Sequence, residues 1–174
     1  MKKELIKKSK FLSLILRHDP GRVGLCLDDN GWADIEELLN KTSITREELL
    51  EIIATNEKNR FAIKGHKIRA SQGHSIKSID LDLSPIRPPD VLYHGTSKDS
   101  LDSIMIKGID KRLRQYVHLS KGILTAVQVG SRHGKSAVLI IDAKKMYEDG
   151  FKFYISENEV WLTDNVPSKY LRVF

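Results

Sequence analysis

The chain has 174 residues, of which 40% are hydrophobic and 30% charged, and it carries a formal charge of +6 with a pI near 9.3. This composition is typical of a globular protein and excludes a disordered chain. No run of about 18 apolar residues is present, and the N-terminal MKKELIKKSK lacks the apolar centre of a secretion signal. We therefore expect a cytoplasmic protein without a membrane partner, whose positive charge favours polyanions such as nucleic acid.

The first helix is predicted at residues 4–17, where apolar residues recur at helical spacing and three lysines fall elsewhere. The apolar residues are Leu5, Leu12, Ile15 and Leu16. The helix should stop near Arg17, because the residue before Pro20 is pushed out of helical conformation. Arg17 and His18 then lie at a helix end, from which both side chains can face one anion.

A short hairpin is predicted next. Leu25 and Leu27 alternate with polar neighbours ahead of Asn30-Gly31, a dipeptide that favours a tight turn. Cys26, the single cysteine, lacks a disulfide partner and a zinc-binding spacing, so we expect it to be reduced and buried between the leucines.

Two capped helices and a second hairpin complete the first half. Capping patterns predict the helices at 35–40 and 46–55, and turn signals predict that 61–63 pairs with 67–70. A helix, two more in close succession and a two-stranded wing form the outline of a winged-helix domain. Such domains commonly bind nucleic acid, although the fold alone does not establish that function.

The domain boundary is predicted within residues 83–90, which contain three of the five prolines and read as a stiff, extended connector. We expect one domain at 1–84, a connector at 85–90 and a second domain at 91–174.

The second half favours a mixed sheet with two or three helices, which makes the fold class α+β. Helical patterns at 97–107 and 123–129 each end at a glycine. The expected strands are 91–94, 116–120, 137–142, 152–155, 160–162 and 170–173. No nucleotide-binding GxGxxG or GxxxxGK motif is present, so a nucleotide would bind by another geometry.

The segment KGHKIRASQGHS, residues 64–75, is the first candidate site. Arg69, Gln72, Gly73 and His74 follow the apolar Ile68, so a strand delivers polar side chains into a loop. From these residues alone, a basic surface hairpin remains an equal alternative.

Three further segments supply candidate residues in the second half. His94-Gly95-Thr96 ends one strand, and His118 with Ser120 ends another, although isolated pairs of this kind are more often surface strand ends. The loop 130–135, GSRHGK, concentrates backbone amides and basic side chains, which suits phosphate groups. Metal binding is not expected, because the histidines lack ligand spacing.

Six motifs, in this order, resemble the successive signatures of the RNA 2'-phosphotransferase family, the NAD-dependent tRNA 2'-phosphotransferases. They are LSLILRHDPGRVGLCLDDNGW, IRASQGHS, LYHGTS, VHLS, VGSRHGK and NEVWLTDNVP, and they span nearly the whole chain. The resemblance implies an N-terminal winged-helix lobe and a C-terminal ADP-ribosyltransferase-like lobe that binds NAD+ as a co-substrate, with no metal.

The same resemblance implies which residues act. The essential arginines and histidine of the family fall on Arg17, His18, Arg69 and Arg132. The residues implied to bind NAD+ are His94, Gly95, Thr96, His118, Ser120, Gly130 and Arg132. Many ADP-ribosyltransferases carry a catalytic glutamate on a later strand, and here that place falls on Val160, next to Glu159.

The implied reaction explains why such a glutamate is dispensable. The internal 2'-phosphate of RNA attacks the ribose carbon that bears nicotinamide, and a ribose hydroxyl then attacks phosphorus. The products are 2'-hydroxyl RNA, ADP-ribose 1'',2''-cyclic phosphate and nicotinamide. A phosphate monoester carries roughly −1.5 to −2 charges at neutral pH, so the first nucleophile needs no base. The base of the second step stays open, with His118 as a candidate.

Three alternatives remain at this stage. A winged-helix nucleic-acid binder without catalysis would leave the histidine and GSRHGK segments unexplained. An ADP-ribosyltransferase that modifies protein would ordinarily need the missing glutamate, and one that modifies terminal phosphates of nucleic acid would use only the first step. The expected partners are therefore NAD+ and an RNA that carries an internal 2'-phosphate, and the protein is expected to be a monomer.

Overall fold

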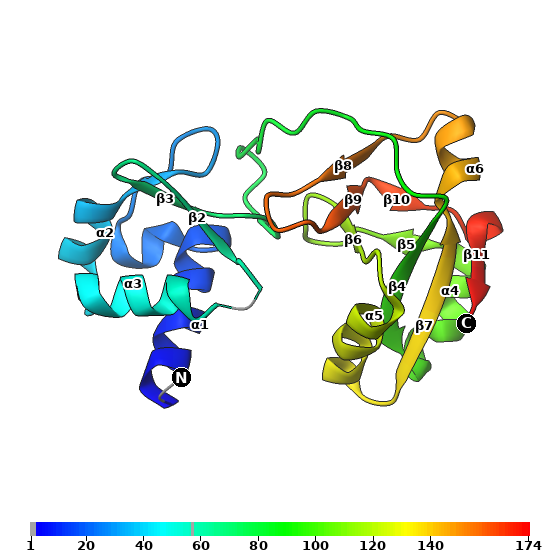
Figure 1. Cartoon of the computed structure of the whole chain (residues 1–174), viewed down its shortest axis with the longest axis horizontal. Coiled ribbons are helices and arrows are strands. Elements are labelled where there is room, and N and C mark those ends of the chain that lie inside the picture. Colours follow the sequence, from blue (N-terminus) through cyan, green and yellow to red (C-terminus); the bar gives the residue numbers. More distant parts are fainter. Residues whose placement is uncertain (1–2, 57) are drawn as a thin grey trace. The chain divides into compact units, whose positions relative to one another are not determined.

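The computed structural model describes residues 3–56 and 58–174. The chain divides between Asp82 and Leu83 into two compact units, and each has its own hydrophobic core (Figure 1). We call them unit 1 and unit 2. Helices and strands occur together in both, which makes the fold class α+β, as predicted.

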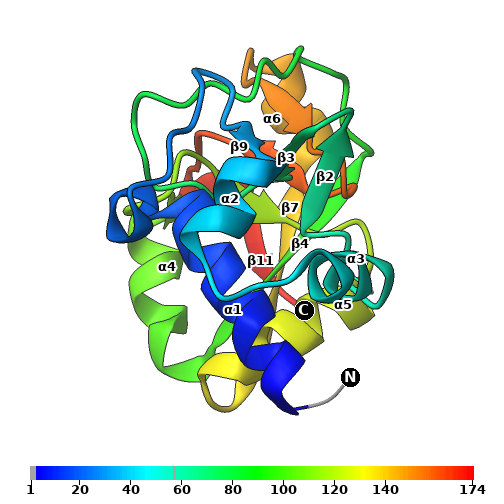
Figure 2. The ribbon, with the colours of Figure 1, turned by 90° about the vertical axis from the view of Figure 1, so that its left-hand side faces the viewer.

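The three helices predicted for unit 1 are confirmed. They are α1 (Lys3–Arg17), α2 (Ile35–Lys41) and α3 (Arg46–Ala54), with a short 3-10 helix, η1 (Pro20–Val23), after α1. In Figure 2, α3 is seen nearly end-on whereas α1 runs across the view, so the two helices cross steeply. The buried side chains that fill this crossing include Leu12, Ile15, Leu16, Leu49 and Ile52.

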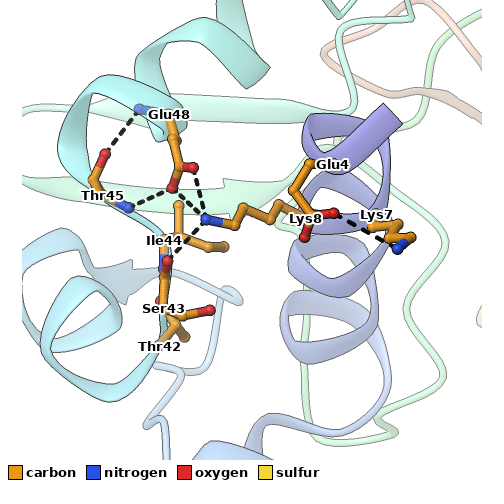
Figure 3. A network of polar contacts seen from close by, with 8 residues as sticks. All are labelled: Glu4, Lys7, Lys8, Thr42, Ser43, Ile44, Thr45 and Glu48. Carbon is orange, nitrogen blue, oxygen red and sulfur yellow. Dashed lines mark hydrogen bonds and ion pairs between the residues drawn. The ribbon is translucent and has the colours of Figure 1, made fainter. Parts of the chain in front are cut away.

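A polar network ties α1 to the start of α3 (Figure 3). Lys8 Nζ lies 2.6 Å from Glu48 Oε1 and also donates to the backbone oxygen of Ser43 at 3.0 Å. Glu48 in turn accepts from the backbone N–H of Thr45, whose hydroxyl accepts from the N–H of Glu48. This reciprocal capping box fixes the residue at which α3 begins.

The sheet of unit 1 has the order β1-β3-β2, with β1 (Ala33–Asp34), β2 (Phe61–Lys64) and β3 (Lys67–Ala70) all antiparallel. The predicted hairpin of β2 and β3 is therefore confirmed. Ile68 of the middle strand is paired with Ala33 of β1 on one side and with Ile63 of β2 on the other.

The hairpin predicted around Asn30-Gly31 is wrong. Residues 25–27 form no strand, and the carboxylate of Asp28 instead accepts hydrogen bonds from the backbone N–H groups of Asn30 and Trp32. This side chain closes a turn locally, and the chain then pairs with β3. Cys26 is exposed, contrary to expectation, because Leu25 is the residue of this segment that turns inward to the core.

Unit 2 is built around two long antiparallel strands, β4 (Val91–Ser97) and β7 (Ser136–Asp142), which lie side by side in Figure 1. β11 (Leu171–Val173) pairs with the other edge of β7. Helix α5 (Ile123–Gly130) packs against β4 and β7. The side chains on the face of these strands opposite α5 point into the core of unit 2, where Leu92, Leu139 and Ile141 are buried.

Smaller elements complete unit 2. The second sheet has the order β6-β9-β8, and β5 pairs with β10. The remaining strands are β5 (Ile109–Asp110), β6 (Val117–Leu119), β8 (Phe153–Ile155), β9 (Trp161–Thr163) and β10 (Asn165–Val166). The remaining helices are α4 (Leu101–Lys107), α6 (Ala143–Glu148), η2 (Lys98–Ser100), η3 (Ser131–His133) and η4 (Ser168–Tyr170).

The expectation of a mixed sheet is wrong, because every strand pair in the described part of the chain is antiparallel. One isolated bridge, between Tyr93 of β4 and Ser120, joins the two larger sheets of unit 2. Its two backbone hydrogen bonds are both 2.8 Å long.

The proline-rich segment has no helix or strand between residues 79 and 89. It is nevertheless anchored, because the backbone N–H of Ile86 donates to the oxygen of Phe153 in β8 at 2.8 Å. Within the described residues, no helix is both long enough and apolar enough to cross a membrane.

Candidate functional site

The end of α1 holds two of the predicted residues. The backbone N–H groups of His18 and Asp19 both donate to Leu14 O, and the helix then gives way to η1. The loop that follows β3 is tethered to this helix end by Ser75. Its N–H donates to Arg17 O at 3.0 Å, and its hydroxyl oxygen lies 3.0 Å from His18 Nδ1. The loop therefore holds both Arg17 and His18 in place.

Arg69, the third predicted residue in unit 1, is fixed by β3 and by the turn before β1. Only 8% of it is exposed. Its guanidinium carbon lies 4.6 Å from the centre of the Trp32 ring, and Nη1 donates to Asn30 O at 3.2 Å. Stacking on the indole and a hydrogen bond at one end hold this guanidinium in a fixed position.

A buried histidine lies among these cations. His74 is fully buried, and its pKa is lowered to about 4, chiefly by burial and then by the charges of Arg17, Arg69 and His18. Neither ring nitrogen has a hydrogen-bond partner among the described residues. At neutral pH the ring is therefore uncharged. The structure thus brings Arg17, His18 and Arg69 together around one neutral imidazole.

Two glycines make room for this arrangement. Gly31 has φ of +79°, and a Cβ built there would lie 3.2 Å from His74 Nε2. Gly73 has φ of +89°, and its Cβ would lie 3.6 Å from Arg17 Nη1. Both conformations favour glycine, so the loop can approach the ring and the guanidinium closely. The result is a compact cationic cluster suited to a multiply charged oxyanion.

In unit 2, His94 and His118 lie on neighbouring segments. His94 Nδ1 is 3.0 Å from the backbone oxygen of His118. The bridge between Tyr93 and Ser120 holds these two segments together. Burial lowers the pKa of His94 and the charge of Arg112 adds to this, although the hydrogen bond to His118 acts in the opposite sense. His94 is therefore neutral at physiological pH.

Two arginines at this place were missed by the sequence reasoning. Arg114 Nη1 lies 3.2 Å from His118 Nδ1, and the charge of Arg112 acts on His94. The signal was present in KRLRQYVHLS, in which a basic run immediately precedes the histidine motif. Local sequence does not distinguish this run from an ordinary solvated surface, where basic residues usually lie.

Gly95 and Gly130 prove to have a packing role. A Cβ on Gly95 would lie 1.8 Å from Ala126 O, and a Cβ on Gly130 would lie 2.7 Å from Thr96 O. The two glycines therefore allow α5 to pack directly on the backbone of β4. Thr96, which follows Gly95 in β4, is buried, with 8% exposure. Contact of these residues with a dinucleotide stays a prediction.

Arg132 lies in η3, directly after α5, and it is exposed. It belongs to unit 2, whereas Arg17, His18 and Arg69 belong to unit 1. Gly134, two residues further on, has φ of +116° and open space around the place of a Cβ.

Val160 lies directly ahead of β9, which begins at Trp161, one residue later than the predicted strand start. Its backbone oxygen accepts from Ser156 N at 3.0 Å, and its neighbour Glu159 is exposed with φ of +60°. The described residues contain no group of three histidine, cysteine or acidic side chains placed to hold a metal ion.

Taken together, these features define an α+β protein with a compact cationic cluster in one unit and paired histidines in the other. Comparison with known proteins gives the family. The model of the RNA 2'-phosphotransferase, Tpt1 / KptA family matches residues 3–165. The chain belongs to this family, which confirms the resemblance seen in the sequence.

Bacterial relatives cover nearly the whole chain. A protein of Hahella chejuensis, described as a probable RNA 2'-phosphotransferase, is 53% identical over 98% of this chain and 95% of its own. Relatives with the same description are 49% identical in Rhodopirellula baltica, over 97% and 96% of the two chains, and 52% identical in Flavobacterium johnsoniae, over 94% and 93%.

Proposed function

We propose that this protein transfers the internal 2'-phosphate of an RNA, of the kind left at a tRNA splice junction, to NAD+. The observation that carries the proposal is the clustering of Arg17, His18 and Arg69 around His74, in a chain of the RNA 2'-phosphotransferase family. The products are 2'-hydroxyl RNA, ADP-ribose 1'',2''-cyclic phosphate and nicotinamide.

In the first step, a 2'-phosphate oxygen bonds to the ribose carbon of NAD+ while the bond from that carbon to nicotinamide breaks. The nucleophile carries roughly −1.5 to −2 charges and nicotinamide leaves neutral, so neither needs a proton transfer. The first step therefore needs no catalytic glutamate, which is consistent with the apolar Val160 at the place where many ADP-ribosyltransferases have one. The intermediate is an RNA whose 2'-phosphate is ADP-ribosylated.

In the second step, the adjacent ribose hydroxyl bonds to phosphorus and gives up its proton. The bond from phosphorus to the 2'-oxygen of the RNA breaks, and that oxygen takes up a proton to leave as the 2'-hydroxyl. Negative charge gathers on the equatorial oxygens of phosphorus. Arg17 and Arg69 offer fixed, permanently charged donors for these oxygens, and His18 adds a third group. By analogy with oxyanion-hole donors, each arginine is worth about 2 to 4 kcal/mol of transition-state stabilisation.

The immobility of this cluster supports the proposed role. Arg69 is held by Trp32 and Asn30 before any ligand arrives, so little reorganisation is needed when charge develops. The neutral ring of His74 adds no further charge to the cluster.

We propose that NAD+ binds to His94, Gly95, Thr96, His118, Ser120, Gly130 and Arg132. The chemistry of these residues fits the ligand. A neutral His94 does not repel the cationic nicotinamide ring, and Arg112 and Arg114 add positive charge nearby for the pyrophosphate. Arg132 is proposed to stabilise the phosphorus centre during the second step.

The test is incubation of an RNA bearing one internal 2'-phosphate with the protein, with and without NAD+. We expect phosphate-free RNA and the cyclic phosphate only when NAD+ is present. Arg17→Ala and Arg69→Ala should each slow single turnover by about 30- to 1000-fold. Arg46→Ala, which removes an exposed arginine of α3, is the matched control and should leave the rate unchanged.

The alternative is an ADP-ribosyltransferase that acts on terminal phosphates of nucleic acid or on protein. A stable ADP-ribosylated product without release of 2'-hydroxyl RNA would favour that alternative. Removal of the 2'-phosphate without NAD+ would refute the proposed co-substrate.

A further inference from the structure

The ring of His118 is in contact with Arg114, a residue outside the predicted site. Arg114 Nη1 and His118 Nδ1 are 3.2 Å apart. A guanidinium can only donate, so Nδ1 must offer a lone pair in this contact. A neutral imidazole with an unprotonated Nδ1 carries its proton on Nε2. The contact therefore selects one of the two tautomers of His118.

The turn that presents Arg114 is fixed by several interactions. The backbone N–H of Arg114 donates to Lys111 O at 3.0 Å, and Lys111 Nζ lies 3.0 Å from Asp164 Oδ1. Arg112, within the turn, has φ of +53°, and its N–H donates to Asp110 Oδ1. A non-glycine residue in this conformation requires surroundings that hold it. The guanidinium is thus attached to a defined backbone.

His94 has the opposite tautomer. Its Nδ1 is 3.0 Å from the backbone oxygen of His118, and a carbonyl oxygen can only accept, so Nδ1 of His94 carries the proton. Burial keeps this ring neutral, which leaves a lone pair on Nε2. The segment from Arg114 to His118 therefore sets the proton position on both rings, and it gives one Nε2 donor and one Nε2 acceptor.

We infer that Arg114 is a positioning residue that holds His118 as a hydrogen-bond donor through Nε2–H and prevents it from acting as a base. The geometry requires a lone pair on Nδ1, which Arg114 already occupies. A second proton on the ring would place two cations in contact. The inference rests on the proposed function only in naming NAD+ as the group that receives the hydrogen bond.

A base and a donor differ in what can replace them. The side-chain amide of glutamine places an N–H close to the position of Nε2, but it cannot take up a proton at neutral pH. If His118 is a donor, His118→Gln should keep most of the rate. If His118 is the base of the second step, His118→Gln should be as defective as His118→Ala.

The first measurement uses no turnover. Two-bond proton–nitrogen correlation spectra of the protein with ¹⁵N-labelled histidine distinguish the two tautomers, and His118→Gln assigns the signal. We expect His118 protonated at Nε2 and His94 at Nδ1. Arg114→Ala should populate the other tautomer of His118 and leave the His94 signal in place, which shows that unit 2 is folded. Arg114→Lys should restore part of the original state.

Arg172→Ala is the matched control for this measurement, because it removes an exposed arginine from β11 of the same unit. It should leave both histidine signals unchanged. A wild-type His118 protonated at Nδ1, or an Arg114→Ala spectrum identical to that of the wild type, would overturn the inference.

The second measurement is single turnover of the 2'-phosphorylated RNA with NAD+. We expect His118→Gln within about tenfold of wild type, and His118→Ala slower than His118→Gln by about 10- to 100-fold, the effect of one lost hydrogen bond. A base would instead give equal losses of about 100- to 10,000-fold in both variants. If the wild type shows no turnover, the proposed function fails, while the spectra still decide the role of Arg114.

Discussion

His74 makes the stability of unit 1 depend on pH. Its pKa is about 4 in the folded protein, against 6.5 for an unperturbed histidine, because the ring is buried among Arg17, Arg69 and His18. Between these values the unfolded chain binds a proton that the folded chain does not. Stability contributed by the neutral ring is therefore fully present above pH 6.5 and falls as the pH is lowered toward 4.

The size of the effect follows from the same two values. Each pH unit in this window costs about 1.4 kcal/mol, so the loss is about 2 kcal/mol at pH 5 and about 3 kcal/mol in total. His74→Gln removes the titrating group. The free energy of unfolding of this variant should change less between pH 7 and pH 5 than that of the wild type, by about 2 kcal/mol.

Urea unfolding at the two pH values measures the difference. The fluorescence of Trp32 reports on the unfolding of unit 1 once the second tryptophan is removed. The substitution Trp161→Phe therefore serves as the background for every variant. His66→Gln is the control, because His66 is exposed on the β2-β3 turn. Carboxylates that titrate in this range contribute equally to all variants and cancel. Equal pH sensitivity in His74→Gln and wild type would refute the reasoning.

Two further predictions concern the cap of α3 and the packing of α5 on β4. Thr45→Ala removes the capping box of α3 and should lower the free energy of unfolding of unit 1 by about 1 kcal/mol in the same urea assay; an unchanged value would contradict the role given to this cap. Gly95→Ala forces α5 away from β4, because a Cβ meets Ala126 O at 1.8 Å, and should destabilise unit 2 by about 1 to 3 kcal/mol. Gly122→Ala is the control, because a Cβ there would meet only the hydroxyl oxygen of Thr125, at 4.0 Å; equal thermal midpoints for the two variants would contradict the packing argument.

The elements that the sequence predicted well depend on local signals. The helices of unit 1 follow from apolar spacing, from the capping residues Asp34 and Thr45, and from Pro20, which ends α1 before it. The β2-β3 hairpin follows from Lys64-Gly65. These signals are contained within a few residues, so no knowledge of distant partners is required.

The elements that were missed depend on distant partners. β5 and β10 have two residues each, and they are strands only because they pair with one another across more than fifty residues. The direction of pairing in unit 2 is equally absent from local sequence. Helix α6 was also missed, but its signal is local: Asp142 caps the helix and its carboxylate accepts from the backbone N–H of Lys145.

The candidate site shows the same division. Arg17 and His18 were placed correctly at a helix end, because Pro20 fixes where α1 stops. The stacking of Arg69 on Trp32 and the burial of His74 were not predictable, because they arise when the turn before β1 meets β3. Residue types can suggest a cationic site, but the neutrality of the ring within it depends on tertiary burial.

The bridge between Tyr93 and Ser120 has a mechanical consequence. His94 is carried by the sheet that contains β4, whereas His118 is carried by the sheet that contains β6. Two backbone hydrogen bonds act as a clasp between these sheets, next to both rings. Each sheet keeps its own hydrogen-bond ladder, so these two bonds couple the position of one imidazole to that of the other.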